Sequence, residues 1–84
     1  MNNKITQEDI DNLIDNTQYH VFENTTTTLC LITLKNGFTV TGESACVDPQ
    51  NFNKEIGEKI AFNNAKEKIW LLEGYLLNYK LKNK

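Results

Sequence analysis

Apolar and polar residues alternate in different patterns along the chain, and each pattern predicts a different element. Near the start, Ile10, Leu13 and Ile14 recur at the i, i+3, i+4 spacing of one helical face. Thr6 is followed three residues later by an acid, which resembles a capping box. We therefore expect a short helix that begins after Thr6 and fades by Asn16-Thr17.

The middle of the chain has the composition of strands and contains a tight turn signal. Residues 26–34 are rich in Thr, Ile and Leu and lack Gly and Pro, which predicts a full strand. Asn36-Gly37 favours a hairpin, because a type I′ turn needs positive φ at both central residues. A two-residue loop pairs Thr33 with Val40 and leaves the first strand the more buried one. Residues 19–22 form either a third strand or an extended connection.

A long helix is predicted in the last third of the chain. Asp48 is a good N-cap, and Pro49 is tolerated at the first helical position because its missing N–H needs no partner there. We expect this helix to run from Pro49 to about Ile69 or Leu72. Gly74 then ends or turns the helix before a short C-terminal segment.

The apolar stripe of this long helix changes face partway along. At 100° per residue, Phe52, Ile56 and Ile60 fall within a sector of about 80°, and the apolar positions between 61 and 69 fall nearly opposite. Either the helix bends near Asn63-Asn64, or its two halves contact different bodies, which implies a homo-oligomer. The candidates for this oligomer or partner interface are Trp70, Tyr75, Phe62 and Ile69, with Trp70 the best single hot spot.

Length and composition predict one small α+β domain spanning residues 1–84. It consists of a short N-terminal helix, an antiparallel hairpin or three-stranded sheet, and a long C-terminal helix followed by a short helical segment. The apolar runs are far shorter than the roughly 20 residues needed to cross a bilayer, so we expect no membrane span. We expect a cytosolic protein, since the chain has no signal-peptide pattern.

Charge is unevenly distributed between the two parts of the chain. Residues 1–48 carry seven acidic side chains against two lysines, whereas residues 49–84 carry seven lysines against four glutamates. This polarity favours head-to-tail self-association, a charged partner, or simply solvated faces. All nine basic residues are lysine, which argues against reading duplex DNA because bidentate contacts to guanine use arginine.

The sequence contains few groups that could perform chemistry. His20 is the only histidine, and neither CxxC nor HxxxH spacing occurs, so we expect no metal site, no cofactor and no catalytic residues. Cys46 lies just before a predicted helix start, where a thiol pKa falls, but no base lies nearby in the sequence, and a small buried residue is the simpler interpretation.

The start of the long helix is a candidate anion site. Its free N–H groups could bind a phosphate, with Ser44 and Asn51 as further donors and Lys54 one turn along. Asp48 argues against this site because its carboxylate already supplies the negative partner. The glycine-rich phosphate loops are absent from the sequence.

Several strings in the chain resemble a family of small tailed-phage proteins, the gp-forty-nine/sixty-six-like family. The resemblance covers roughly residues 5–80. Members often have proline just after the tryptophan, where this chain has Leu71. The strings that carry the resemblance are Leu34 to Pro49, Asn51-Phe52, Glu55-Ile56-Gly57, Lys59-Ile60-Ala61, Asn64-Ala65, Lys68-Ile69-Trp70 and Leu72 to Leu77.

The resemblance implies a phage protein made in the cytoplasm of a host bacterium, and it brings no catalytic residues. Small phage accessory proteins commonly bind and disable host machinery, immune systems included. We therefore expect a non-enzymatic accessory protein for counter-defence or host takeover, which inhibits a host bacterial protein or sequesters a signalling nucleotide. The alternative is a nucleic-acid-binding regulator that uses the lysine-rich C-terminal half.

Overall fold

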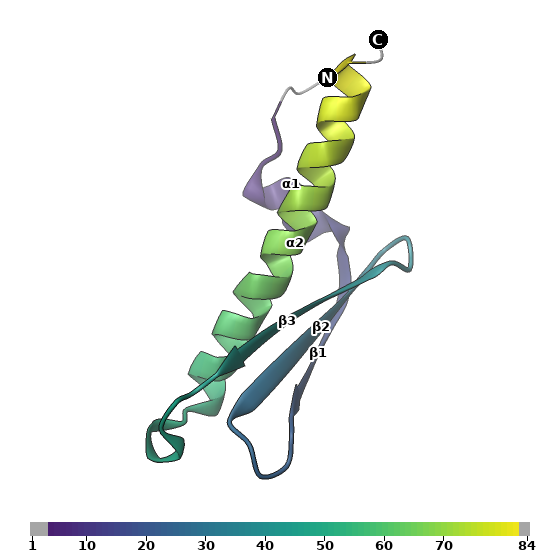
Figure 1. Ribbon diagram of the computed structural model, residues 1–84. Helices are drawn as coiled ribbons and strands as arrows, with labels where there is room; N and C mark the ends of the chain where they lie inside the picture. The colour runs from purple at the N-terminus through teal and green to yellow at the C-terminus, as the bar shows by residue number, and fades with distance from the viewer. Residues whose placement is uncertain (1–3, 83–84) are drawn as a thin grey trace.

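One long helix lies across one face of a three-stranded antiparallel sheet (Figure 1). The computed structural model describes residues 4–82. The predicted α+β class is confirmed, and the sheet has three strands in the order β1-β2-β3. The elements are α1 (Gln7–Leu13), β1 (Ile14–Val21), β2 (Thr27–Leu34), β3 (Thr39–Ala45), the 3₁₀ helix η1 (Pro49–Asn51) and α2 (Lys54–Lys82).

The first helix begins as predicted and ends earlier. The Thr6 hydroxyl accepts a hydrogen bond from the Asp9 N–H, and the Asp9 carboxylate accepts one from the Thr6 N–H. This reciprocal capping box fixes the start of α1. The helix ends at Leu13, since Ile14 adopts extended backbone and pairs with Leu34 at the start of β1. The expectation of helix up to residues 16–17 is wrong, because pairing with β2 overrides the helical spacing of the isoleucines.

The hairpin between β2 and β3 exists, but its predicted register is wrong by one residue. The loop has three residues, and positive φ occurs at Gly37 but not at Asn36. Leu34 donates its N–H to the Phe38 carbonyl (2.8 Å) and accepts one from the Gly37 N–H (2.9 Å). These bonds are typical of a type I turn followed by a glycine bulge. As a result Ile32, and not Thr33, pairs with Val40.

This register places the apolar side of β3 on the buried face of β2. The face toward α2 carries alternating buried residues of β2 together with Val40 and Gly42 of β3. A register shifted by one would place the polar side of β3 among them. The buried apolar core consists of Ile10, Cys30, Ile32, Leu34, Val40, Ala61, Ala65 and Ile69.

The closest approach of helix and sheet occurs at Gly42. A Cβ atom built there would lie 2.2 Å from the Ala65 nitrogen and 2.3 Å from the Ala61 carbonyl oxygen. Real Cβ atoms do not approach backbone this closely, so only glycine allows α2 to lie at this depth. Two alanines on the helix side complete this tight contact.

The long helix starts later and ends later than its sequence predicts. Asp48 caps η1, not α2, by accepting from the Gln50 N–H. Asn53 caps α2, and its side-chain oxygen accepts from the N–H groups of Glu55 and Ile56. The helix continues through Gly74 to Lys82, so the predicted C-terminal helical segment is the last part of α2 itself.

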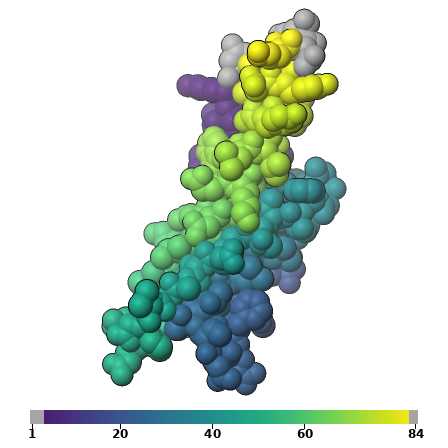
Figure 2. Space-filling view, viewed as in Figure 1, coloured from purple at the N-terminus to yellow at the C-terminus, as the bar shows by residue number. Residues whose placement is uncertain are grey.

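The helix is much longer than the sheet on which it lies. Its 29 residues span about 43 Å, whereas a strand of eight residues spans about 26 Å. The molecule is accordingly elongated, with extents of 53 × 22 × 18 Å. In Figure 2 the C-terminal part of α2, in light green and yellow, extends beyond the strands, and α1 and the segment before it lie beside it.

Candidate interaction surface

The two sides of α2 have different neighbours. One side, which we call the β3 flank, borders the free edge of β3, where Asn64 donates its side-chain N–H to the Glu43 carbonyl (2.8 Å). The opposite side, which we call the α1 flank, faces α1, where Lys66 forms an ion pair with Asp11. The β3 flank consists of Ile56, Ile60, Asn64, Lys68, Leu71 and Tyr75, and the α1 flank of Phe62, Lys66 and Trp70.

A cavity of about 170 Å³ lies on the β3 flank, where β3 ends and α2 begins. Its wall is mainly apolar, with Ile56 and Ile60 on the helix side. Ser44 lies in the wall and donates its hydroxyl to the Gly57 carbonyl (2.7 Å), which fixes the end of β3 against α2. Asn51 also lines the cavity, and its side-chain N–H bonds to the Asp48 carboxylate (3.2 Å).

A second, shallower hollow lies on the same flank beside the first half of β3. Lys68 and Leu71 line it from the helix, and Phe38 lines it from the hairpin. Phe38, Leu71 and Tyr75 are 55%, 71% and 73% exposed. The β3 flank therefore combines an open strand edge with a row of exposed apolar side chains.

The α1 flank is covered by the chain itself. Phe62 and Trp70 are half-buried and pack against the core. The Lys66 ammonium lies 2.7 Å from the Asp11 carboxylate and 5.3 Å from the centre of the Phe62 ring. Its hydrogen bond lowers the pKa of Asp11 below the ordinary aspartate value. These contacts attach α1 to the middle of α2.

The four predicted interface residues are not brought together. Ile69 is fully buried in the core beneath α2, where no partner can reach it. Phe62 and Trp70 lie on the α1 flank, whereas Tyr75 lies on the β3 flank. Five residues along a helix correspond to a rotation of about 140°, which separates Trp70 from Tyr75. Tyr75 alone among the four has the high exposure expected of an interface residue.

The three predicted anion-binding residues are divided between two places. Ser44 and Asn51 line the cavity on the β3 flank, whereas Lys54 lines a different hollow together with Tyr19 and Glu58. Asn53 already accepts from two N–H groups at the start of α2. The structure thus places Ser44 and Asn51 at one cavity without the cation, and the Ser44 hydroxyl hydrogen is already bonded to the Gly57 carbonyl.

The thiols and the imidazole lie in unrelated surroundings. Cys30 is buried in the core, and burial raises the pKa of its thiol. Burial also raises the pKa of its cross-strand neighbour Tyr19. Cys46 donates its thiol to the Asp48 carbonyl (3.0 Å), and His20 contacts the edge of the Phe22 ring. Among residues 4–82, no three His, Cys, Asp or Glu side chains come together as metal ligands.

Comparison with known proteins identifies the origin of the chain. The chain matches the model of the family described as "Phage protein (N4 Gp49/phage Sf6 gene 66) family" over residues 5–81. The chain belongs to this phage protein family. No curated protein matches it, and no solved structure does. Within the described residues, no helix of this phage protein is both long and apolar enough to span a membrane.

Apart from Tyr75, the exposed apolar residues of the β3 flank are the part that sequence reasoning did not name as a site. Their signal was present as the helical stripe of Phe52, Ile56 and Ile60. The structure buries the opposite stripe, containing Ala65 and Ile69, against the sheet and leaves Ile56 and Ile60 exposed. Of two nearly opposite stripes on one helix, a single small sheet can cover only one.

Proposed function

We propose that this phage protein is a non-enzymatic accessory protein that acts on host machinery by binding, as a counter-defence or host-takeover factor in the cytoplasm of the host bacterium. Membership of a phage protein family supports its action during infection. The observation that carries a binding function is the apolar surface at the C-terminal end of α2, which the other described residues leave exposed. Large apolar patches that stay exposed on a protein surface usually mark sites of interaction with another molecule.

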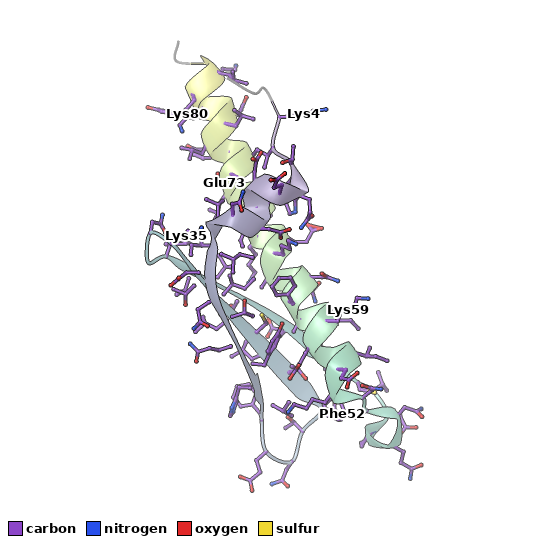
Figure 3. All side chains as sticks on the ribbon, turned by 180° about the vertical axis from the view of Figure 1, so that it is seen from behind. Lys4, Lys35, Phe52, Lys59, Glu73 and Lys80 are labelled. Carbon is purple, nitrogen blue, oxygen red and sulfur yellow. The ribbon has the colours of Figure 1, made fainter. Side chains whose placement is uncertain are left out.

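A host protein is the first candidate target. Where α1 meets the end of α2, a hollow of about 280 Å³ is lined by Ile5 and Leu76 and bordered by Asp9 and Lys80. Figure 3 shows Lys4, Glu73 and Lys80 at this same end of the molecule. An apolar centre with a charged rim is the usual anatomy of a protein interface. Binding there would inhibit a host protein by covering part of its surface.

A signalling nucleotide is the second candidate, favoured by the cavity beside Ser44 and Asn51. In an otherwise apolar wall, the second amide N–H of Asn51 can donate and the hydroxyl oxygen of Ser44 can accept, which suits a flat heterocycle with hydrogen-bonding edges. At about 170 Å³ the cavity is smaller than the roughly 300 Å³ at the lower limit of ligand pockets, so it accommodates one ring system and not a whole nucleotide. Lys54 lies elsewhere, and another cation would have to meet the phosphates.

A nucleic-acid-binding regulator is less well supported by the lysine positions. At 100° per residue, the lysines of α2 (Lys54–Lys82) are spread over a sector of about 220° instead of forming one stripe. Lys66 is also engaged with Asp11. Binding to a phosphate backbone needs several cations on one face, and its affinity falls steeply with salt.

The test is a purification from infected host cells with paired variants. For a protein target, Leu76→Glu is expected to abolish capture of a host protein that the wild type and Leu81→Glu retain, since residues 76 and 81 lie on different sides of α2. For a nucleotide, Asn51→Ala is expected to lose a co-purifying compound that absorbs at 260 nm and that Gln50→Ala retains. Nuclease treatment separates a free nucleotide from nucleic acid. A wild-type preparation with neither a specific host protein nor a bound compound contradicts the proposal.

A further inference from the structure

The edge of β3 is open except at the Glu43 carbonyl, which accepts a hydrogen bond from the Asn64 side chain. The bond from the Leu34 N–H to the Phe38 carbonyl sets which backbone groups of β3 point toward β2. Along a strand, successive residues direct their N–H and C=O groups alternately toward and away from the neighbouring strand. Thr39, Thr41 and Glu43 therefore direct these groups away from β2, which agrees with the hydrogen bond from Asn64 to the Glu43 carbonyl. The other edge strand, β1, is interrupted by a bulge between Ile14 and Asn16, whereas β3 pairs without one. Bulges protect an edge from pairing with another chain, so β3 is the less protected edge.

The exposed apolar side chains of α2 lie beside this same edge. Ile56, Ile60, Leu71 and Tyr75 fall within a sector of about 100° around the helix. Ile56 and Ile60 are 57% and 46% exposed, and Phe38 continues the row from the hairpin. With roughly 100 Å² left exposed on each of the five side chains, two copies would bury about 1,000 Å² of side-chain surface. That is the lower limit of a specific interface, before the strand backbone is added.

The β3 flank is complementary to the same flank of a second copy in the antiparallel orientation. If two α2 helices lie antiparallel about the midpoint between Glu67 and Lys68, Glu67 of each copy faces Lys68 of the other. The same reversal places Ile60 opposite Tyr75 of the second copy. Both charged side chains are exposed. Opposite charges that face each other across an interface fix its register and orientation.

The strand has its own midpoint at the same level of the molecule. Asn64 contacts Glu43, and the hollow lined by Lys68 and Leu71 borders residues 38–41, so the middle of the helix row lies beside Thr41. Reversing β3 about Thr41 pairs Thr41 with itself and Thr39 with Glu43. A single two-fold axis therefore satisfies the strand edge and the helix flank together.

The spacing of helices is also suitable. The sheet contacts of α2 are mainly with β3 and to a lesser extent with β2, so the helix axis lies slightly inside the edge strand. With strands about 4.8 Å apart and each helix about half a strand spacing inside β3, the two axes would be about 10 Å apart. Packed helices are separated by about 8 to 10 Å.

From these observations we propose that the chain forms a two-fold symmetric homodimer through the β3 flank. Two β3 strands pair antiparallel to make one six-stranded sheet, and the two α2 helices pack antiparallel on one face of it. The second copy is thus the occupant of the row of exposed side chains. This proposal goes beyond the proposed function and holds whichever host molecule is bound.

The test measures mass by size-exclusion chromatography with light scattering over a dilution series of the purified protein. The wild type is expected to be a dimer that dissociates on dilution. Leu71→Glu places two carboxylates in the interface and is expected to raise the dissociation constant about a hundredfold. Leu81→Glu is the matched control on the same helix and is expected to leave the mass unchanged. A monomeric wild type at the highest soluble concentration overturns the proposal.

Proline substitution tests the strand pairing separately. Thr41→Pro removes an outward N–H that the paired strand would need, so it is expected to abolish the dimer. The monomer is expected to fold, because an edge strand tolerates proline where the N–H faces solvent. Thr17→Pro is the control on the other edge, since the bond from the Phe22 N–H to the Thr27 carbonyl makes the Thr17 N–H point outward too. Circular dichroism checks that both variants fold. Equal dimerisation of the two variants overturns pairing through β3.

A charge exchange tests the register. Glu67→Lys and Lys68→Glu are each expected to weaken the dimer about tenfold, because each places like charges opposite each other twice. The double variant E67K/K68E restores opposite charges across the axis and is expected to recover wild-type affinity within about twofold. A double variant as weak as the single ones overturns this register. A monomer that still captures a host partner overturns the dimer and leaves the proposed function standing.

Discussion

The α1 flank and the β3 flank of α2 contain similar residue types, yet the chain covers only one of them. On the α1 flank, Phe62 and Trp70 pack against the core and Lys66 is held by Asp11. On the β3 flank, Leu71 and Tyr75 remain more than two-thirds exposed. The difference arises because α1 is available to cover one flank, whereas β3 is the last strand and nothing follows it in the sheet. An apolar residue on this helix therefore serves folding or association according to its neighbours, and not according to its type.

The largest expected effect on stability comes from a substitution at Gly42, which disrupts the close contact between β3 and α2. Gly42→Ala places a Cβ within 2.3 Å of two backbone atoms of α2, so helix and sheet must separate. We expect a loss of about 3 kcal/mol in the free energy of unfolding, at the upper end of overpacking effects. Urea unfolding followed by circular dichroism measures it.

A matched glycine substitution provides the control. Among the described residues, no atom beyond the chain neighbours and the local backbone of the helix lies within 4 Å of a Cβ built at Gly74, which is inside α2 and exposed. Gly74→Ala is therefore expected to stabilise the protein by about 0.5 to 1 kcal/mol, because alanine is the better helix former. If both variants destabilised equally, close contact at Gly42 would not be the cause.

The glycine contact also indicates how far sequence reasoning can reach in this chain. The capping box at Thr6 was found because it is local, and the hairpin was found because its turn residues are adjacent. The register depends on which face of β3 meets α2 at Gly42, a contact between residues about 20 positions apart, and the turn signal at Asn36-Gly37 is compatible with a two- or a three-residue loop. The turn signal alone therefore could not decide the register.

The candidate surface shows the same limit. Two opposite stripes on one helix could be read from spacing, and so could the need for a second body. The spacing could not show which stripe faces the sheet. Ala61 and Ala65 are less apolar than the isoleucines of the other stripe, and they still form part of the core. Small side chains were selected there by the depth at which the helix lies over Gly42. Ile69 was for this reason assigned to a surface when it belongs to the core.

Substituting one aromatic residue on each flank tests the comparison directly. Trp70→Ala is expected to cost about 2 kcal/mol of unfolding free energy, less than the 3 to 5 kcal/mol of a fully buried aromatic, because Trp70 is half-buried. Tyr75→Ala is expected to change the unfolding free energy of the monomer by less than about 0.5 kcal/mol and to weaken self-association. Chemical unfolding at a dilution that dissociates the dimer separates the two effects. The opposite ranking would mean that the flanks have been assigned the wrong way round.

A smaller gain is expected from a polar group beneath the start of α2. The Thr28 hydroxyl is fully buried and has no hydrogen-bond partner among residues 4–82, and Gly57 lies directly over it. Thr28→Val replaces this hydroxyl by a methyl group of similar size, and we expect it to stabilise the protein by about 1 kcal/mol. Thr33→Val, on the opposite face of the same strand, is the control for β-propensity. A gain at Thr33 equal to that at Thr28 would exclude relief of the unpaired hydroxyl as the cause.

The smallest effect is expected from the ion pair on the α1 flank, and it depends on pH. The hydrogen bond from Lys66 lowers the pKa of Asp11 in the folded state, so between the folded and the unfolded pKa the unfolded chain binds more protons. The pair therefore contributes its full stability above the ordinary aspartate pKa of about 4 and loses it as pH falls through the folded value. Urea midpoints at pH 7 and pH 3 are expected to differ less in Asp11→Asn than in the wild type. Asp15→Asn, an exposed aspartate in β1 with no ion pair among the described residues, is expected to behave as the wild type does. Because this pair lies on the α1 flank, Asp11→Asn should loosen α1 at pH 7 without disturbing the β3 flank, and the dissociation constant of the dimer at pH 7 should stay unchanged unless the two flanks are coupled through α2.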